Sequence, residues 1–384
     1  MAEMRVTTKN GHSKPRYRPT WAEIDLKAIE HNYKQVRRLV GKRTNIMVVV
    51  KANAYGHGIC QVSRVLDIDG IDYLGVATVD EAIKLREDEI KAPILVLGSV
   101  LAEEAKAAIG DGVTLTLCSY ELLDVLVSVA KHMKQRPKVH IKVDTGMGRI
   151  GVWHEEAADF IRHVHGTGVI EVEGVYTHFF SGRDALMTEM QLSAFNKVIE
   201  DIKLSGIEPR YKHAASSIAV VDWEKSHMNL VRPGILLYGV YPKPEFRQDF
   251  QLKPVMALKT RIVFLKDAPP GRGISYGRTY ITQKPTKVAT IPIGYADGYG
   301  RILSNKAEAI VRGQYVRVVG KVTMDQTLLD VGNVDNVRVG DEVVLFGRQG
   351  SAEIPVEKIA KLAGTIPYEI IVGIMDRVPR MYRG

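Results

Sequence analysis

The chain has 384 residues, of which 45% are hydrophobic and 25% charged, as in an ordinary globular protein. Its formal net charge of +9 comes from 53 basic residues dispersed among 44 acidic ones. Without a long basic run, this pattern argues against a nucleic-acid partner. No apolar run reaches the roughly 18 to 20 residues that a membrane span needs, so the sequence predicts a cytoplasmic protein with no membrane partner.

The first segment, residues 1–19, is polar and basic. It has no apolar stretch of the kind found in a secretory signal. The sequence therefore predicts a flexible basic leader here.

From residue 20 to residue 255, short strand-like runs alternate with segments of helical composition. The strand-like runs are IMVVVK, YLGVAT, PILVLG, VTLTLC, VHIKVD, VEGVYTH, RYKHAA and NLVRPG. Segments such as DEAIKLRED and YELLDVLVSVAK lie between them, with apolar residues three and four apart. Eight such units predict an α/β fold, a (β/α)8 TIM-like barrel over residues 20–255.

The character changes from Met256 onward. Pieces such as TKVATIPIGY and GDEVVLFG are rich in strand formers and are separated by glycine turns, and only PVEKIAKLAG has helical composition. Residues 256–384 are therefore predicted to form a mainly β C-terminal domain.

Polar residues follow the predicted barrel strands at the end where such barrels bind their ligands. They are Lys51, Asp144, Arg149, His178, Ser216, Ser217 and Arg232. A lysine partly removed from water beside other cations has a lowered pKa and can form a Schiff base with an aldehyde. Pyridoxal phosphate is such an aldehyde, and the HAASS and RPGI segments offer hydroxyls and backbone amides for its phosphate.

Each of these features also has a purely structural interpretation. Lys51 taken alone could be a surface charge, and DTGMGRIG lacks the Gly-Lys-Ser/Thr ending of a phosphate-binding P-loop. Without HxH, HExxH or CxxC spacing, His57, His178 and His213 predict no metal site. Ser217 has no G-x-S-x-G elbow around it, which argues against a serine nucleophile.

The motifs taken together and in order resemble alanine racemase, a pyridoxal 5'-phosphate enzyme with a barrel and a β domain. They are TWAEIDLKAIEHNY, VVVKANAYGHG, KVDTGMGRIG, THF, HAASS, VRPGILLYG, ISYGRTY, IPIGYADGY, VTMDQ and GTIPYEI. The resemblance runs from about Thr20 to Arg383.

The resemblance implies a role for each matching residue. Lys51 matches the lysine that holds the cofactor, and Tyr276 matches a second catalytic base that the partner subunit supplies. Arg232 matches the arginine facing the pyridine nitrogen, and His178 the histidine beside the ring. The matches to phosphate ligands are Tyr55, Ser217, Gly234, Ile235 and Tyr368. The matches near the substrate are Arg149, Tyr295 and Met324, and Lys142 matches a lysine that is often carbamylated.

The implied reaction is the interconversion of L-alanine and D-alanine by two bases, with Lys51 on the D face and Tyr276 of the partner subunit on the L face. The resemblance further implies a homodimer with shared active sites that supplies D-alanine for cell-wall peptidoglycan. Three alternatives stay open: a related racemase that prefers serine or lysine, a basic amino acid decarboxylase, and a non-catalytic pyridoxal-phosphate carrier.

Overall fold

The computed structural model describes residues 5–6, 14–15, 17–68, 70–243, 245–246 and 250–384. The leader predicted over residues 1–19 lies largely outside the described residues. The chain divides into two compact units. One consists of 29–54 and 58–253, and the other of 55–57 and 254–384 together with the described part of the first 28 residues.

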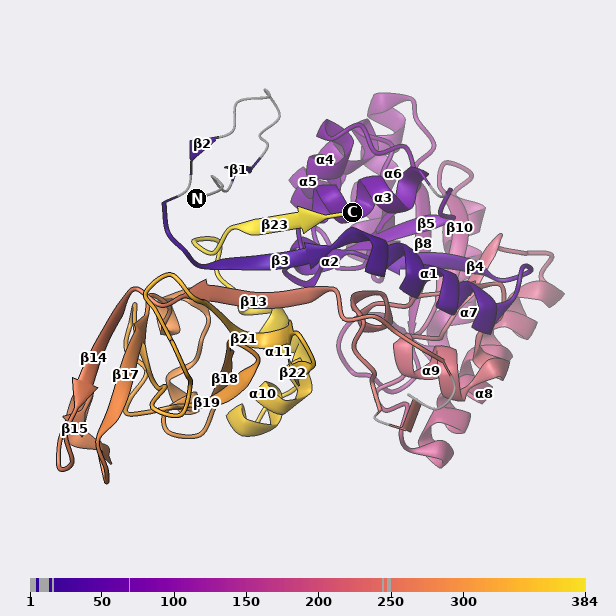
Figure 1. Ribbon diagram of the computed structural model, residues 1–384. Coiled ribbons are helices and arrows are strands. Elements are labelled where there is room, and N and C mark those ends of the chain that lie inside the picture. The colour runs from indigo at the N-terminus through magenta and orange to yellow at the C-terminus, as the bar shows by residue number, and fades with distance from the viewer. Residues whose placement is uncertain (1–4, 7–13, 16, 69, 244, 247–249) are drawn as a thin grey trace. The chain divides into compact units, whose positions relative to one another are not determined.

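Eight parallel strands form a nearly closed barrel in the described part of the first unit (Figure 1). They are β4 (Asn45–Val49), β5 (Tyr73–Val76), β6 (Ile94–Val96), β7 (Thr114–Leu117), β8 (Lys138–Asp144), β10 (Glu171–Tyr176), β11 (Tyr211–His213) and β12 (Leu230–Val231). The order is β11-β10-β8-β7-β6-β5-β4-β12, and a parallel bridge between Ser216 and Arg232 links its two ends. The predicted (β/α)8 barrel is therefore confirmed. A short strand, β9 (Val152–Trp153), pairs with β8.

Helices and turns precede, connect or follow the barrel strands, and the longer helices lie outside the barrel in Figure 1. They are α1 (Leu26–Val40), α2 (Lys51–Tyr55), α3 (Ile59–Ile68), α4 (Val79–Glu87), α5 (Ala102–Gly110), α6 (Tyr120–Met133), α7 (His154–Gly166), α8 (Ala185–Leu204) and α9 (Ser217–Asp222), with the 3-10 turns η1 (Glu224–Ser226) and η2 (Ile235–Tyr238). Local chemistry sets their starts. The Ser119 hydroxyl accepts a hydrogen bond from the Leu122 amide at the start of α6, and Asp184 caps α8 in the same way.

Strand β8 is buried on both faces, which is typical of parallel strands covered by helices. Its alternation sends Val139, Ile141 and Val143 to one face and His140 and Lys142 to the other. The two polar residues are 0% and 2% exposed. The barrel core is thus not uniformly apolar, and its buried polar groups need partners.

The described part of the second unit contains a ten-stranded sheet. Its strands are β3 (Trp21–Asp25), β13 (Met256–Arg261), β14 (Phe264–Ala268), β17 (Thr286–Ile291), β18 (Glu308–Val311), β19 (Gln314–Val318), β20 (Thr327–Asp330), β21 (Glu342–Gln349), β22 (Ala352–Ile354) and β23 (Arg380–Arg383). The main path is β14-β17-β20-β19-β18-β21-β13-β3-β23, with β22 beside β21. The predicted mainly β C-terminal domain is confirmed.

The remaining elements of this unit are the hairpin of β15 (Gly273–Ile274) and β16 (Tyr280–Ile281), the helices α10 (Val356–Ala363) and α11 (Pro367–Val372), and the 3-10 turns η4 (Tyr276–Arg278), η5 (Tyr295–Asp297) and η6 (Arg301–Leu303). In the described N-terminal residues, β1 (Arg5–Val6) pairs with β2 (Lys14–Pro15).

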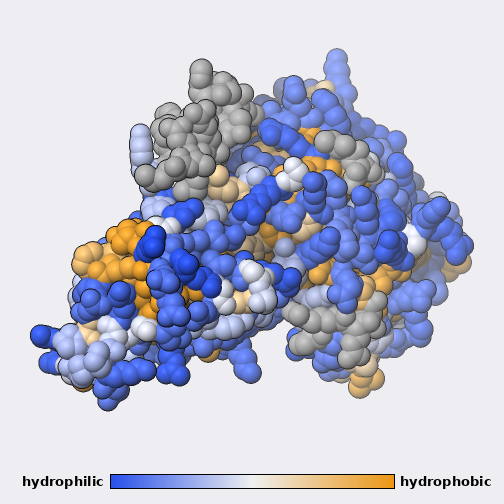
Figure 2. Space-filling view, viewed as in Figure 1, coloured by the Kyte–Doolittle hydropathy of each residue, from blue (hydrophilic) through white to orange (hydrophobic). Residues whose placement is uncertain are grey.

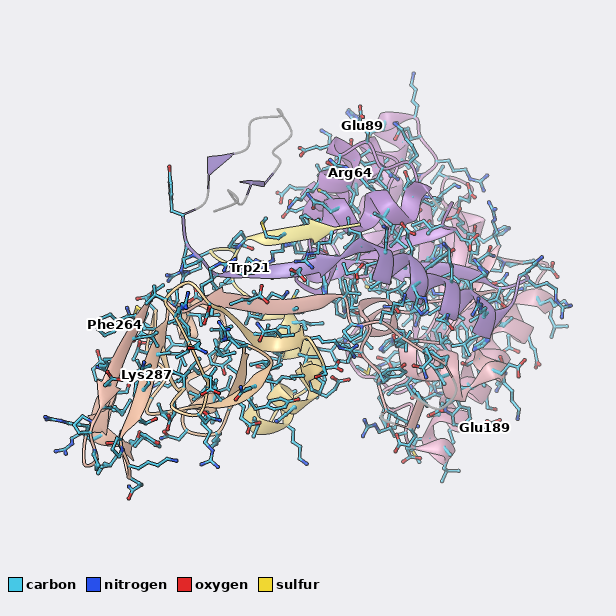
Figure 3. All side chains as sticks on the ribbon, in the orientation of Figure 1. Trp21, Arg64, Glu89, Glu189, Phe264 and Lys287 are labelled. Carbon is cyan, nitrogen blue, oxygen red and sulfur yellow. The ribbon has the colours of Figure 1, made fainter. Side chains whose placement is uncertain are left out.

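Strand β3 falls within the residue range predicted for the barrel, and it pairs with β13 and β23 in the sheet of the second unit. Its first residue, Trp21, is labelled in Figure 3. The Arg261 guanidinium lies 5.6 Å from the centroid of the Trp21 ring, close enough for a cation–π contact.

The face of the molecule shown in Figure 2 is largely hydrophilic, with a hydrophobic patch over the C-terminal β domain. Val263, just before β14, and Phe264, the first residue of β14, are 39% and 54% exposed. Across the described ranges, no helix combines the length and apolar character that a membrane crossing requires.

Candidate active site

A left-handed turn directly after β4 carries Lys51. The φ angles of Ala52, Asn53, Ala54 and Tyr55 are 53°, 55°, 53° and 52°. This conformation costs about 1–2 kcal/mol per residue for L-amino acids other than glycine. A run of such residues persists only where the surrounding structure holds it in place.

Hydrogen bonds around Asn53 hold this turn. The Asn53 side-chain oxygen accepts from the Ile59 amide at 2.9 Å, and the Asn53 amide donates to the Glu81 carboxylate at 3.1 Å. The Glu81 carboxylate also accepts from the Ala77 amide at 2.9 Å. Asparagine tolerates the left-handed region better than most residues, which suits it to this position.

The amine of Lys51 is made less basic by its surroundings. Burial lowers its pKa, the Arg149 cation lowers it further, and Glu81 opposes both effects. A larger fraction of this amine is therefore neutral near pH 7 than for a lysine in water. A neutral amine is the form that attacks a carbonyl carbon.

Further basic residues gather around the same end of the barrel. Lys142 is 2% exposed, and burial, together with the Arg232 and Arg149 cations, lowers its pKa to about 7. His178 has a pKa well below its usual value because of burial and the cations of Arg232, Lys142, Arg149 and Lys51. These mutual effects are those of basic groups that lie near one another, and Arg232 Nη2 lies 3.4 Å from His178 Nδ1.

Arg232 is the most firmly held member of this group. Its Nη2 donates to the Thr177 carbonyl at 2.7 Å and to the Ala214 carbonyl at 3.0 Å, and lies 3.4 Å from His178 Nδ1. Its Nη1 lies 2.7 Å from Nδ1 of the buried His213. Burial lowers the pKa of Arg232 to about 10, so it stays protonated at neutral pH.

Ser217, Gly234 and Ile235 form the part of this site predicted for phosphate. The Gly234 amide donates to the Ser217 hydroxyl oxygen at 2.8 Å, and that hydroxyl proton remains available for a ligand. Ile235 begins η2 directly afterwards. A basic site with an amine nucleophile and a free hydroxyl donor suits an aldehyde carrying a phosphate, so the residues present fit pyridoxal phosphate.

The other predicted residues belong to the second unit and are described within it. The rings of Tyr55 and Tyr368 lie 6.0 Å apart between centroids. Burial raises the pKa of both phenols, that of Tyr368 to about 12, so both stay protonated and can donate hydrogen bonds.

Tyr295 and Met324 lie on adjacent loops. The Tyr295 amide donates to the Thr323 carbonyl at 3.1 Å, and the Ala296 amide donates to the Met324 carbonyl at 3.0 Å. The side chains are 42% and 53% exposed. Tyr276 in η4 is 71% exposed and follows Ser275, whose φ is 60°.

Sequence reasoning missed the roles of Glu81 and Tyr176, and it gave His213 only a structural interpretation. Tyr176 stacks on His213 with centroids 4.7 Å apart and an interplanar angle of 2°. Its ring also lies 5.2 Å from both the Arg232 guanidinium and the Lys142 amine. Tyr176 lies at the end of β10, two residues before His178, and this position in the sequence could have indicated that it belongs to the site.

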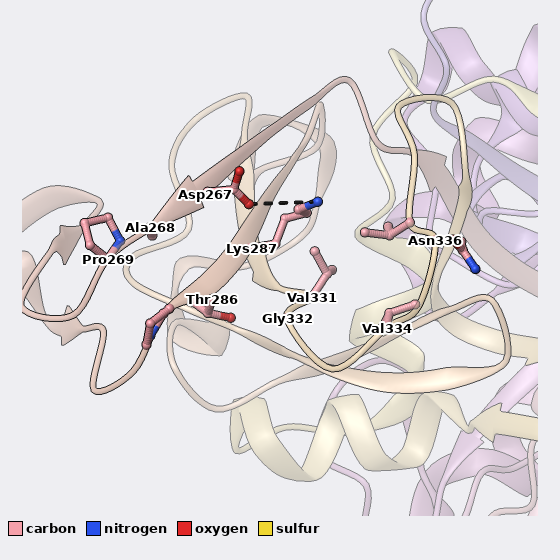
Figure 4. A pocket seen from close by; sticks show the side chains of 11 residues that line it. Asp267, Ala268, Pro269, Thr286, Lys287, Val331, Gly332, Val334 and Asn336 are labelled. Atoms are coloured by element: carbon pink, nitrogen blue, oxygen red, sulfur yellow. Dashed lines mark ion pairs between the residues drawn. The ribbon is translucent and has the colours of Figure 1, made fainter.

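A pocket of about 670 Å³ in the C-terminal domain lies apart from this group. Its lining includes Asp267 and Lys287, an ion pair at 3.9 Å (Figure 4), and none of the predicted site residues. In the described ranges, no three His, Cys, Asp or Glu residues lie close enough to hold a metal ion.

Known proteins resemble this chain over nearly its whole length. Residues 24–242 match the family model described as alanine racemase, N-terminal domain, and residues 255–382 match alanine racemase, C-terminal domain. The alanine racemase of Halothermothrix orenii is 46% identical over 368 residues, covering 95% of this chain and 97% of that protein. The alanine racemase of Methanococcus maripaludis is 43% identical, covering 95% and 98%.

Solved structures agree with these relatives. The alanine racemase of Clostridium difficile 630 superposes with a TM-score of 0.92 at 37% identity, covering 96% of each chain. That of Bacillus anthracis, with bound L-Ala-P, gives a TM-score of 0.90 at 38% identity, covering 97% of this chain and 96% of that one. The fold, the sequence and the basic group at the barrel's end agree, and the chain belongs to the alanine racemase family.

Proposed function

We propose that the chain interconverts L-alanine and D-alanine with pyridoxal 5'-phosphate held at Lys51. The observation that carries this proposal is the basic group at the barrel's end in a chain of the alanine racemase family: Arg232 Nη2 lies 3.4 Å from His178 Nδ1, and the Arg149 cation adds to burial in lowering the pKa of Lys51. When bound, the cofactor acidifies the α-carbon of an amino acid joined to it by delocalising negative charge. The protein then has to remove one proton and return another on the opposite face.

Two bases on opposite faces would perform this exchange. Lys51 serves the D face, where its lowered pKa makes the neutral amine, the form that accepts a proton, more accessible than for a lysine in water. Tyr276 of the partner subunit serves the L face. The 71% exposure of Tyr276 within its own chain supports its donation to a neighbouring subunit.

Arg232 would determine which reaction follows. A guanidinium only donates hydrogen bonds, so facing a pyridine nitrogen it keeps that nitrogen unprotonated. Arg232 would thereby limit the charge that the ring can withdraw, compared with an acid at the same place, and so favour plain proton exchange over transamination. This choice also argues against a decarboxylase, since those enzymes place an acid at the same position.

The other residues would position ligands. Tyr55, Ser217, Gly234, Ile235 and Tyr368 bind the phosphate through hydroxyls and amides, and His178 lies beside the ring. Arg149, Tyr295 and Met324 contact the substrate, with the Arg149 guanidinium pairing with its carboxylate.

Lys142 is proposed to be carbamylated. With a pKa of about 7, its amine is largely neutral above pH 7 and can attack carbon dioxide, releasing one proton and forming a carbamate. The Arg232 and Arg149 cations that disfavour an ammonium at this place would stabilise the resulting anion.

The active species would be a homodimer, with each site sharing residues from two chains. The product D-alanine is proposed to supply cell-wall peptidoglycan.

The test is a chiral assay. Protein purified with pyridoxal phosphate is given L-alanine, L-serine and L-lysine separately, and the D-isomer of each is followed by chromatography. D-alanine should form fastest, and Lys51→Ala should abolish it. Faster formation of D-serine or D-lysine would refute the preference for alanine, and no D-isomer at all would refute the racemase and favour a cofactor carrier.

A further inference from the structure

A chain of buried polar side chains runs through the barrel interior from Arg232 to Glu173. His213 Nε2 lies 2.8 Å from His140 Nδ1, and His140 Nε2 lies 3.4 Å from the Glu173 carboxylate. Both histidines are 0% exposed, and Glu173 is 5% exposed. The two histidines are 73 residues apart in sequence and come from β8 and β11.

The chemistry of the two ends fixes the direction of every hydrogen bond between them. Arg232 has only donors, so Nδ1 of His213 must accept. Its proton is then on Nε2, which donates to Nδ1 of His140. That leaves the proton of His140 on Nε2, where it donates to Glu173.

Both histidines must be neutral for this arrangement. Burial lowers the pKa of His213 well below its usual range, and Arg232 lowers it further. Burial likewise lowers the pKa of His140, although its hydrogen bond to Glu173 acts in the opposite direction. A second proton on either ring would place two donors face to face.

Glu173 stays an anion and therefore an acceptor. Burial favours its neutral form, but hydrogen bonds from His140, Lys138 and Tyr73 hold its pKa at about 2. The Tyr73 hydroxyl lies 2.9 Å from one carboxylate oxygen and the Lys138 amine 2.8 Å from the other. Because Tyr73 has one proton and gives it to Glu173, it accepts in turn from the Thr114 hydroxyl at 2.6 Å.

The absence of a side chain at Gly174 leaves space for the His140 ring. A Cβ added to Gly174 would lie 2.6 Å from Nδ1 of His140, closer than real Cβ atoms approach. Tyr176, on the same strand β10, stacks on the His213 ring and keeps its plane fixed. The strand is thus shaped around the two imidazoles.

We propose that Glu173 and His140 are positioning residues for Arg232. Glu173 holds both histidines in the Nε2–H form, and Arg232 therefore meets a lone pair at His213. If both histidines changed to the Nδ1–H tautomer, the Nδ1–H group of His213 would point at the Arg232 guanidinium. Two donors would then face each other, and the guanidinium would be displaced. We call the hydrogen-bonded series Arg232, His213, His140 and Glu173 the relay. Its hydrogen-bond directions depend only on residues of this protein, while its effect on the reaction rests on the proposed function of Arg232.

The first test is neutron diffraction from crystals of the deuterium-exchanged holoenzyme. We expect deuterium on Nε2 of His140 and of His213, none on Nδ1 of either ring, and none on Glu173. Deuterium on Nδ1 of either histidine, or on both nitrogens of one ring, would overturn the proposal. This measurement needs no variant and no turnover.

The second test compares Glu173→Gln with Tyr73→Phe. The glutamine amide turns its oxygen toward Lys138 and its NH2 group toward His140, which reverses the relay. Tyr73→Phe removes a hydrogen bond from the same carboxylate and leaves the acceptor for His140 in place. We expect kcat for alanine to fall roughly tenfold in Glu173→Gln with little change in KM, from the loss of one charged hydrogen bond.

Tyr73→Phe should keep kcat within about twofold of the wild type. Equal losses of kcat in the two variants, or wild-type kcat in Glu173→Gln, would contradict the positioning role. If the wild-type protein formed no D-alanine, the proposed function would fail, while the neutron result would still decide the relay.

Discussion

At the scale of single residues, the barrel changes the acid–base behaviour of groups that the sequence presents as ordinary lysines and histidines. Burial is the first cause of the lowered pKa of Lys51, Lys142, His178 and His213, and neighbouring cations add to it. A cluster of this kind is costly for stability, since each charged form is removed from water. Such costs are typical of active sites.

Lys142 offers a direct measurement of this cost. Its folded-state pKa of about 7 lies below the ordinary value of 10.5. Between these two values the unfolded chain binds one more proton than the folded chain, so stability rises with pH. We expect the free energy of unfolding of the wild type, relative to Lys142→Met, to increase from pH 7 to pH 10 in buffer free of carbon dioxide.

Urea titrations across this range provide the measurement, with Lys138→Met as the control. Lys138 lies on the same strand, half exposed, and its hydrogen bond with Glu173 raises its pKa. It stays protonated in both states over this range, so its replacement should leave the pH slope unchanged. If the difference in the free energy of unfolding between the wild type and Lys142→Met did not change from pH 7 to pH 10, the pKa of Lys142 would not be lowered in the folded state.

At the scale of elements, two loops are held in shapes that their own sequences do not favour. The turn from Ala52 to Tyr55 is left-handed, and Asn53 stabilises it through the Ile59 amide. The loop that carries Tyr295 depends on Asp297, which is 0% exposed. In both cases a polar side chain holds the backbone near a predicted catalytic or substrate residue.

The left-handed turn can be tested by a pair of variants at Asn53. Asn53→Ala and Asn53→Gly both lose the hydrogen bond to the Ile59 amide, but only alanine is strained at a φ of 55°. We expect Asn53→Ala to be less stable than Asn53→Gly by about 1 kcal/mol in urea unfolding. The reverse order would mean that the turn relaxes to a right-handed form.

The Asp297 carboxylate accepts a hydrogen bond from Arg18 at 2.7 Å and one from the Gly294 amide at 2.9 Å, and it forms an ion pair with Arg377 at 3.0 Å. Asp297→Asn leaves Arg18 with a neutral partner and Arg377 with Asp325 as its remaining carboxylate, and we expect a loss of about 3 kcal/mol in the free energy of unfolding because Asp297 is fully buried.

The matched control is Asp325→Asn. Asp325 also pairs with Arg377, at 2.8 Å, but its side chain is 54% exposed. Exposed pairs contribute little, so this change should stay within about 0.5 kcal/mol of the wild type. Equal losses from the two variants would show that burial of Asp297 does not matter.

At the scale of the whole molecule, the proposed two-base reaction would draw on more than one chain. Lys51 belongs to the barrel unit and Tyr276 to the other unit, where its side chain is exposed. If each site takes its second base from a neighbour, two defective chains can repair each other. The prediction concerns assembly and not the fold of either unit.

Mixing Lys51→Ala chains with Tyr276→Phe chains should restore part of the activity after subunit exchange. Alone, Tyr276→Phe should lose roughly a hundred- to ten-thousandfold in kcat, the usual contribution of a general base, and Lys51→Ala should form no D-alanine. In a mixed dimer one of the two sites has both bases, so activity should return toward half of the wild-type value per dimer. No recovery, with exchange verified by mass spectrometry, would exclude a shared site.

The sequence by itself determined the fold class and the candidate residues. Eight β-branched runs separated by amphipathic segments predicted the barrel, because the periods of strands and helices are local properties. The β-rich composition after Met256 predicted the second domain in the same way. The ordered motifs also placed Lys51, His178 and Arg232 at strand ends, where a barrel brings them to one side.

Only the tertiary structure decided how these residues behave. The direction of the His140–His213 relay depends on Arg232 and Glu173 at its two ends, and the pKa of Lys142 depends on burial and on cations from other strands. The bond between Arg18 and Asp297 joins residues 279 positions apart. Burial, charge proximity and tautomers arise from contacts between distant segments, and a local sequence pattern carries no record of those contacts.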